Sequence, residues 1–325
     1  MLRLKTTYGG PPAYQFNGHL QTLIPGKFRK LPDALFTRER INTSDGDFLD
    51  LDWLKNGHDR LIILNHGLEG NSSRQYNLGA AHHFKDRNWD VLAWHCRSCS
   101  EEINQTFSLY YHGNYQDLEE VIRHVLAANV YKKILLVGFS MGGSILSKYL
   151  GIKGNQVPSE IIGGVSFSAP CDLAASIKAV EKKSNWIYNL YFRKMLNAKV
   201  LAKAKQFPNR LDWSKIDELK DWRSFDQTYS CHLNGYDDVD DFYEQGSCKN
   251  FFHRVSTPLL IVNALNDPII PNTCINYEQI KRHKYIDVEY PKNGGHVGFT
   301  DGNLRNSWME KRVEEFLIEQ YGPFD

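Results

Sequence analysis

The chain has 325 residues, of which 42% are hydrophobic and 24% charged, and its 39 basic and 38 acidic residues leave a net charge of +1. This length allows one large core with an insertion, or two modest domains, and the composition is that of an ordinary globular protein. The balanced charge gives no reason to expect nucleic acid or an anionic membrane as a partner.

The six cysteines are scattered through a chain too large to need disulfide bonds for stability, which favours a reduced, cytoplasmic setting. The N-terminal segment has no apolar run of signal-peptide length. No stretch approaches the roughly 20 apolar residues that span a bilayer. We therefore expect a soluble protein without a stable membrane anchor.

Residues 1–35 are rich in Gly, Pro and aromatic residues and are predicted to form an extended arm over the core. Segments 36–43 and 47–54 flank a Ser-Asp-Gly turn, which predicts a β-hairpin. Short apolar runs without polar alternation predict strands that are covered on both faces. Such runs occupy residues 60–65, 91–94, 133–139, 162–168 and 259–265.

Helical patterns at 73–87 and 115–129 fall between these runs, which predicts βαβ units and a mostly parallel sheet with helices on both faces. The alternation stops at Ala169-Pro170 and resumes with the strand 259–265. A helix, a last strand and a C-terminal helix follow, the latter two at 285–290 and 303–320. We therefore predict a core of residues 1–170 and 257–325, interrupted by a helical lid at 171–256.

The segment Gly138-Phe139-Ser140-Met141-Gly142 matches the G-x-S-x-G pattern of a nucleophile elbow. It ends a predicted strand and begins a helical run, which is the strand–turn–helix setting that the elbow requires. The serine oxygen then lies beside a helix N-terminus, which favours a developing anion. The alternative is a serine that only caps a helix. Together with the order of strands and helices, the motif predicts an α/β-hydrolase fold with Ser140 as nucleophile.

A serine hydroxyl needs a base to take its proton and an acid to orient that base. In this fold both follow the serine along the chain, the acid first. His296 lies in a glycine-flanked turn just after the last predicted strand, so we predict it as the base. His232 and His253 fall in the predicted lid, and His283 lies in a charged helix end.

Asp267 directly follows the strand 259–265, at the edge of the sheet where ligands bind in open α/β folds. We predict it as the acid, with an Asp-Pro turn initiator as the alternative. A denser cluster of carboxylates in the predicted lid lacks the spacing of a calcium loop and is interpreted as a solvated loop. Its members are Asp237, Asp238, Asp240 and Asp241.

Acyl transfer also needs two backbone N–H groups aimed at the developing oxyanion. One is predicted to be that of Met141, immediately after the nucleophile. The loop after the strand 60–65 is expected to supply the other from Leu68, because Gly67 lets the backbone fold toward a ligand. His66 is interpreted as a structural histidine that braces this loop.

Two further motifs carry weaker signals. Cys96-x-x-Cys99 has redox or zinc spacing, but no second cysteine pair supplies the remaining ligands of a zinc site. His112 and Asp117 form an H-x-x-x-x-D spacing that some acyltransferases use as a general base. We favour the simpler interpretation, with Asp117 in the first turn of the helix 115–129 and His112 in the preceding loop. Neither motif predicts a metal or a cofactor.

Together these motifs resemble the YheT-like branch of the α/β-hydrolases, which also holds eukaryotic medium-chain ethyl-ester synthases and lipid-directed hydrolases. The resemblance covers nearly the whole chain. The matching segments are NGHLQT (17–22), HGLEGNSSRQY (66–76), YYHGNYQDL (110–118), GFSMGG (138–143), Phe225-Asp226, Phe242-Tyr243, NALNDPIIP (263–271) and GGHVGF (294–299). The chain departs from the family at CRSCS (96–100), where an aromatic residue and then Arg-Gly-Cys-Ser are usual. Loss of that glycine is expected to reshape the loop beside the acyl pocket.

The resemblance implies a carboxylic ester hydrolase that acts on short- to medium-chain acyl esters, with the same triad and with a lid between Pro170 and Thr257. Ser140 is expected to form an acyl-enzyme from a small-molecule ester, without a cofactor. One alternative is an alcohol O-acyltransferase, in which an alcohol replaces water at deacylation. The other is a catalytically silent binding module on the same fold.

Overall fold

The apolar runs assemble into one mixed, mostly parallel sheet in the computed structural model, which describes residues 2–3, 6–302 and 305–323. Within these residues the sheet has nine strands in the order β1-β9-β8-β7-β6-β4-β5-β3-β2. Only the β2–β3 and β3–β5 pairs are antiparallel. The strands are β1 (Leu2–Arg3), β2 (Thr37–Asn42), β3 (Phe48–Leu54), β4 (Arg60–Asn65), β5 (Asp90–Trp94), β6 (Lys133–Phe139), β7 (Ile161–Phe167), β8 (Leu259–Val262) and β9 (Ile286–Glu289).

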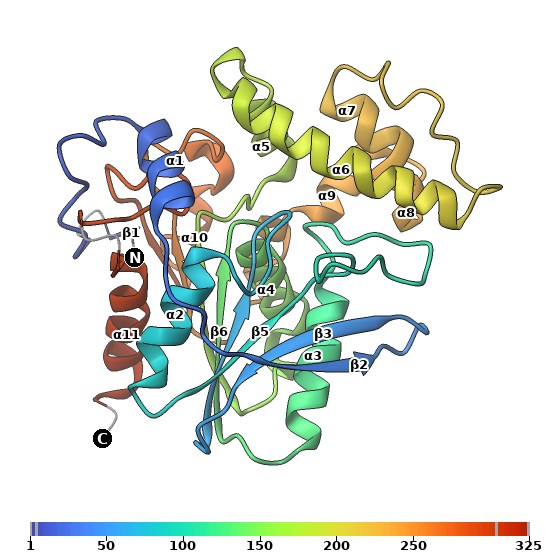
Figure 1. Cartoon of the computed structure of the whole chain (residues 1–325). Coiled ribbons are helices and arrows are strands. Elements are labelled where there is room, and N and C mark those ends of the chain that lie inside the picture. The colour runs from blue at the N-terminus through green and yellow to red at the C-terminus, as the bar shows by residue number, and fades with distance from the viewer. Residues whose placement is uncertain (1, 4–5, 303–304, 324–325) are drawn as a thin grey trace.

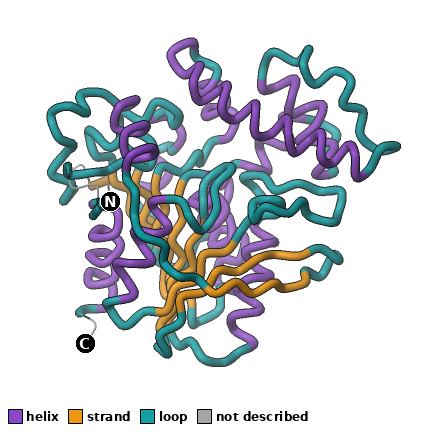
Figure 2. Tube along the Cα trace, in the orientation of Figure 1, coloured by secondary structure: helices purple, strands orange, loops and turns teal. Residues whose placement is uncertain are grey.

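Helices cover both faces of this sheet (Figures 1 and 2). Alternate residues of β4 show how the faces divide, because Leu61 and Ile63 belong to one buried cluster while Ile62 and Leu64 belong to the other. Helices α3 and α4 contribute to the first cluster, and α2 and α11 to the second. Their bounds are α2 (Gln75–Lys85), α3 (Tyr115–Ala127), α4 (Met141–Lys153) and α11 (Trp308–Tyr321).

Five α-helices lie between β7 and β8 in the described chain, above the carboxyl ends of the parallel strands (Figure 1). They are α5 (Leu173–Val180), α6 (Trp186–Gln206), α7 (Trp222–Phe225), α8 (Cys231–Asn234) and α9 (Val239–Gly246). Two buried lysines of α6 bind this layer to the core. Lys199 pairs with Glu69 at 3.0 Å, and Lys203 donates to the Asn104 carbonyl at 2.7 Å.

The predicted hairpin is confirmed by the antiparallel pairing of β2 with β3, and the predicted strands are confirmed with small shifts at their ends. The largest shift is in β8, which ends at Val262 because the backbone then turns, with the Asp267 N–H donating to the Ala264 carbonyl at 3.2 Å. The C-terminal helix begins at Trp308, where Ser307 and Glu310 form a capping box. Residues 303–304 of the predicted helix lie outside the described residues.

The extended arm predicted for residues 1–35 is wrong in two places. Leu2–Arg3 pairs with β9 as an edge strand, and Gly18–Phe28 forms the helix α1, capped by the Asn17 side chain. The start of this helix packs closely against the loop after β8, because a side chain at Gly18 would collide with the Asn266 carbonyl. Residues 1, 4 and 5 of the arm lie outside the described residues. No helix in the described part of the chain has the length and apolar character needed to cross a membrane.

Candidate active site

Ser140 lies between β6 and α4 in a strained turn. Its backbone angles are φ 54° and ψ −121°, a region that non-glycine residues rarely adopt. The flanking glycines allow this geometry. A Cβ at Gly138 would lie 2.5 Å from the Gly142 carbonyl oxygen, and a Cβ at Gly142 would lie 2.2 Å from the Asn65 carbonyl oxygen. The turn therefore holds the hydroxyl clear of the sheet at the start of a helix.

The structure brings Ser140, His296 and Asp267 into one hydrogen-bonded chain. His296 Nε2 lies 2.9 Å from Ser140 Oγ, and His296 Nδ1 lies 2.9 Å from Asp267 Oδ2. The second carboxylate oxygen of Asp267 accepts the N–H groups of Ile269 and Ile270 at 2.8 and 3.0 Å. Both oxygens of the carboxylate are thus fixed, and the imidazole is oriented toward the serine.

Helix α1 fixes the loop that carries His296. Thr22 Oγ1 accepts the His296 N–H at 2.8 Å, and Gln21 Oε1 accepts the Gly294 N–H at 2.7 Å. The Asn266 side chain also links α1 to this loop, since it donates to Gln21 Oε1 at 2.9 Å and accepts the Gly295 N–H at 3.0 Å. Sequence reasoning assigned no role to Gln21 or Thr22; the only signal was their presence in the NGHLQT segment.

The loop after β4 passes close to the serine. A Cβ at Gly67 would lie 3.1 Å from the Ser140 Cβ, so only glycine permits this approach without movement. The Gly67 N–H donates to the Tyr76 hydroxyl and the Glu69 N–H to the Tyr110 hydroxyl. Between them, the N–H of Leu68 donates to no group among the described residues. The Leu68 N–H is thus free to bind an incoming oxyanion. The N–H of Met141, the first of α4, is free in the same way.

His66 braces this loop, as the sequence predicted. Its Nδ1 lies 2.7 Å from the Gly67 carbonyl oxygen, and its Nε2 accepts the Cys96 N–H at 3.0 Å. Burial lowers the pKa of His66 to about 3. The imidazole is therefore neutral and joins the loop after β4 to the loop after β5.

The side chains of His112 and Asp117 do not bind each other, because the Asp117 carboxylate has other partners. Asp117 lies in the first turn of α3, as predicted, and both its oxygens bind Arg97. Asn114 also donates to this carboxylate at 2.8 Å. His112 lies in the preceding loop and lines the cavity beside Ser140, and burial lowers its pKa to about 4.

Cys96 and Cys99 are buried free thiols, and burial raises the pKa of each above its usual value. Cys99 Sγ accepts from Lys199 Nζ at 3.2 Å. Between the two cysteines, Ser98 takes a φ of 62°, in the left-handed region that favours glycine. Its hydroxyl lies 2.6 Å from Asn104 Oδ1 and accepts the Asn104 N–H, which stabilises a loop shape that costs a serine backbone strain.

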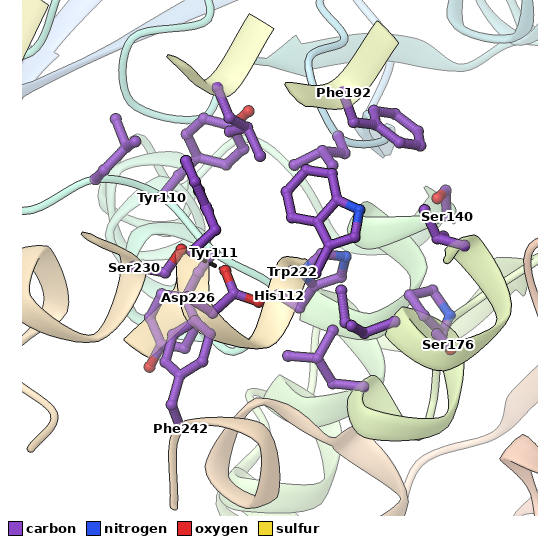
Figure 3. Close-up of a pocket in the computed structure, with 18 of the residues that line it drawn as sticks. Tyr110, Tyr111, His112, Ser140, Ser176, Phe192, Trp222, Asp226, Ser230 and Phe242 are labelled. Carbon is purple, nitrogen blue, oxygen red and sulfur yellow. Dashed lines mark hydrogen bonds between the residues drawn. The ribbon is translucent and has the colours of Figure 1, made fainter. Parts of the chain in front are cut away.

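Two cavities meet at the serine and the imidazole, because Ser140 and His296 line both. The first, of about 940 Å³, lies between the core and helices α5–α9 and is lined mainly by apolar side chains (Figure 3). They include Leu68, Leu173, Ile177, Val180, Phe192, Leu196, Val200, Trp222, Phe225, Leu233 and Phe242. This lining suits an apolar chain.

Asp226 lies on this cavity's wall away from Ser140 (Figure 3). Ser230 and Tyr243 donate to its two oxygens at 2.6 and 2.8 Å, but burial dominates and raises the pKa of Asp226 to about 6.

This pKa makes the stability of the protein depend on pH. An aspartate of the unfolded chain has a pKa of about 3.9. As the pH rises from about 4 to 6, the unfolded chain loses this proton before the folded protein does. Asp226 therefore makes the free energy of unfolding fall over this range, by at most about 3 kcal/mol.

We expect Asp226→Asn to remove that fall, because the amide does not titrate. Urea unfolding of both proteins at pH 4, 5 and 6 measures the effect, since all other titrating groups contribute equally to the two curves. Relative to wild type, the variant should gain stability as the pH rises. Parallel curves would show that Asp226 titrates normally.

Comparison with known proteins gives consistent matches. Residues 60–302 match the family described as alpha/beta hydrolase fold. The chain is 30% identical to "Putative esterase YheT" of Escherichia coli K12 over 93% of its own length and 90% of that protein. It is 28% identical to human "Phospholipase ABHD3", over 94% of this chain and 78% of that protein.

Solved structures share the fold at lower sequence identity. The Pyrococcus furiosus esterase Pf2001 superimposes with a TM-score of 0.58 and 18% identity, over 88% of this chain and 93% of that chain. Est1E from Butyrivibrio proteoclasticus, bound to ferulic acid, gives a TM-score of 0.57 and 16% identity. The match covers 88% of this chain and all of that chain.

Proposed function

This chain belongs to the α/β-hydrolase fold family, in the branch that contains YheT, and we propose that it hydrolyses carboxylic esters through a Ser140–His296–Asp267 triad. The observation that carries the proposal is the chain of two 2.9 Å contacts from Asp267 through His296 to Ser140. The apolar cavity reaches Ser140 beside the backbone N–H of Leu68, which donates to no described group. The relatives named as an esterase and a phospholipase support the same chemistry.

In the proposed reaction, Ser140 Oγ attacks the ester carbonyl carbon while its proton passes to His296 Nε2. The negative charge that develops on the carbonyl oxygen is stabilised by the N–H groups of Leu68 and Met141. The bond from carbon to the alcohol oxygen then breaks, and His296 returns its proton to that oxygen. Water attacks the acyl-enzyme in the same way, with His296 as base, and releases the acid and free Ser140. Asp267 holds the Nδ1–H tautomer throughout.

The acyl chain is assigned to the apolar cavity under helices α5–α9, and residues 171–256 are proposed to act as its lid. This assignment fits the lining, since side chains of α6 such as Phe192, Leu196 and Val200 face the space beside Ser140. Closing apolar walls around the reacting ester also excludes water, which strengthens the electrostatic contacts of the oxyanion.

We expect kcat/KM to rise with acyl length, because each methylene that enters the cavity leaves water. A gain of about 0.8 kcal/mol per CH₂ corresponds to about fourfold per carbon, until the cavity is filled. A panel of p-nitrophenyl esters from acetate to dodecanoate measures the profile. A maximum at acetate would contradict the assignment of the cavity.

Adding ethanol to the same assay tests the alternative function. Formation of ethyl esters in place of free acid would assign the protein as an alcohol acyltransferase.

A further inference from the structure

The loop that carries Leu68 is a tight turn with a strained third residue. The Gly70 N–H donates to the Gly67 carbonyl at 2.9 Å, which closes a four-residue turn from Gly67 to Gly70. Its third residue, Glu69, has a φ of 56°, and turns with a positive φ at this position usually place glycine or asparagine there. Another residue keeps such an angle where its surroundings hold it. The contacts of Glu69 therefore determine whether the turn keeps its shape.

This turn sets the direction of the Leu68 N–H. A peptide unit is planar and trans, so the Leu68 N–H points away from the Gly67 carbonyl oxygen. That oxygen accepts the Gly70 N–H and lies 2.7 Å from His66 Nδ1. The neutral imidazole of His66 accepts the Cys96 N–H on Nε2, so its Nδ1 carries the proton and donates to the same oxygen. With the carbonyl held by two donors, the Leu68 N–H is presented in one direction.

The backbone and the side chain of Glu69 are both held. The Glu69 N–H donates to the Tyr110 hydroxyl at 3.3 Å, and the Glu69 carbonyl accepts Arg74 Nη2 at 2.7 Å. The carboxylate accepts the Tyr110 hydroxyl and lies 3.0 Å from Lys199 Nζ. Tyr110 and Arg74 precede β6 and belong to the core, whereas Lys199 lies in α6. Helix α6 thus binds the strained residue of the turn directly.

The contact between Lys199 and Glu69 is shielded from water. The two side chains are 11% and 2% exposed. Lys199 Nζ also donates to Cys99 Sγ at 3.2 Å and lies 4.5 Å from the centre of the Tyr110 ring. Because removal of one partner of a buried ion pair leaves the other charge uncompensated, loss of Lys199 would weaken the restraint on Glu69.

We propose that Lys199 and Glu69 are positioning residues for the oxyanion hole, so that the Leu68 N–H is correctly placed while α6 rests on the core. This inference rests on the proposed esterase function. A donor stabilises the oxyanion when it is aimed at the position that the oxyanion will occupy. A shifted turn would therefore weaken binding of the transition state more than binding of the intact ester. The ion pair couples the position of the lid to the chemical step.

Lys199→Met tests this coupling, with Lys203→Met as its matched control. Lys203 is also a buried lysine of α6 that binds the core, through the Asn104 carbonyl at 2.7 Å, but it forms no described hydrogen bond with residues 67–70. Any general loosening of the lid is thus common to both variants. With p-nitrophenyl octanoate, Lys199→Met should lower kcat by about 10- to 100-fold and leave KM within about threefold, since loss of a whole oxyanion donor costs about 10²- to 10³-fold. Lys203→Met should keep kcat within about threefold of wild type.

Two further variants show whether the two residues act through one contact. Glu69→Gln should lower kcat by a similar factor, and the double variant Glu69→Gln/Lys199→Met should lose no more than the larger single loss. The double variant removes both charges of the pair. It therefore keeps the test decisive if Glu69→Gln, which leaves the Lys199 ammonium without its acid, does not fold.

A trifluoromethyl ketone with the same acyl chain gives a second readout. Ser140 adds to its carbonyl carbon and passes its proton to His296, which leaves an oxyanion that resembles the one in the transition state. The inhibition constant should rise in Lys199→Met in proportion to the fall in kcat/KM, and it should stay unchanged in Lys203→Met.

Three results would overturn the coupling and leave the esterase standing. They are a rise in KM without a fall in kcat in Lys199→Met, equal losses of kcat in Lys199→Met and Lys203→Met, and a double variant whose loss is the product of the two single losses. A wild type that hydrolyses no ester of the panel would overturn the proposed esterase, and this inference with it.

Discussion

Replacing Ser140 with alanine should lower kcat for ester hydrolysis by about 10⁶-fold if the three side chains act as a unit. The substitution removes the attacking oxygen and leaves the imidazole with no proton to take. It should cost little stability, because among the described residues Ser140 Oγ hydrogen-bonds only to His296, and alanine carries the same Cβ through the turn. Steady-state hydrolysis of an activated ester, with a thermal melt of each protein, measures both effects.

A fluorophosphonate probe gives an independent reading, since it should label the wild type at Ser140 and leave Ser140→Ala unlabelled. Ser144→Ala is a suitable control. Ser144 lies one turn further along α4, and its hydroxyl donates to the Pro170 carbonyl at 3.2 Å rather than to His296. This variant should keep its labelling and turnover. Normal turnover by a folded Ser140→Ala protein would remove the basis of the proposed mechanism.

The sheet and the elbow could be predicted from the sequence because their signals are local. Apolar runs, glycine spacing and the alternation of strands with helices each lie within a short window, and hydrophobic burial then places β6 and α4 side by side. Ser140, Asp267 and His296 could be selected because each follows a predicted strand, in the order that the fold requires, and the carboxyl ends of parallel strands meet at one edge of the sheet.

Helix α1 could not be predicted in the same way. Gly18, Pro25 and Gly26 are helix-breaking residues, so local propensity argues against a helix there. Tertiary contacts stabilise it, because Gln21 and Thr22 accept hydrogen bonds from backbone N–H groups of the His296 loop. The bonded pairs are 273 and 274 positions apart in the sequence. The ion pairs of Arg97 could not be predicted from the sequence either, because its three carboxylate partners converge only in the folded protein.

Asp267→Asn should lower kcat by about 10⁴-fold while leaving the fold intact. Asp267 has two structural roles. Its Oδ1 accepts two backbone N–H groups of the Asp-Pro turn, and its Oδ2 contacts His296 Nδ1. Both interpretations of this residue therefore agree with the geometry, and only function distinguishes them. Asparagine keeps an oxygen for the turn, so the free energy of unfolding should change by no more than about 1 kcal/mol.

The loss of activity follows from the tautomer. An amide nitrogen opposite His296 Nδ1 donates a hydrogen bond, so it favours the imidazole that carries its proton on Nε2. Nε2, already protonated, then cannot accept the proton of Ser140, although it still lies within reach of the serine oxygen. Attack on the ester carbonyl would have to proceed from the un-ionised hydroxyl without a base.

Steady-state kinetics and thermal melts of Asp267→Asn beside Asp237→Asn test this argument. Asp237 is an exposed carboxylate in the segment between β7 and β8, and its substitution makes the same change in charge away from the triad. We expect Asp237→Asn to keep kcat within a few-fold of wild type. If Asp267 serves the turn alone, its asparagine variant should also stay within tenfold. A near-normal Asp267→Asn enzyme would then show that His296 is oriented by Thr22 and the backbone of its loop, without a carboxylate.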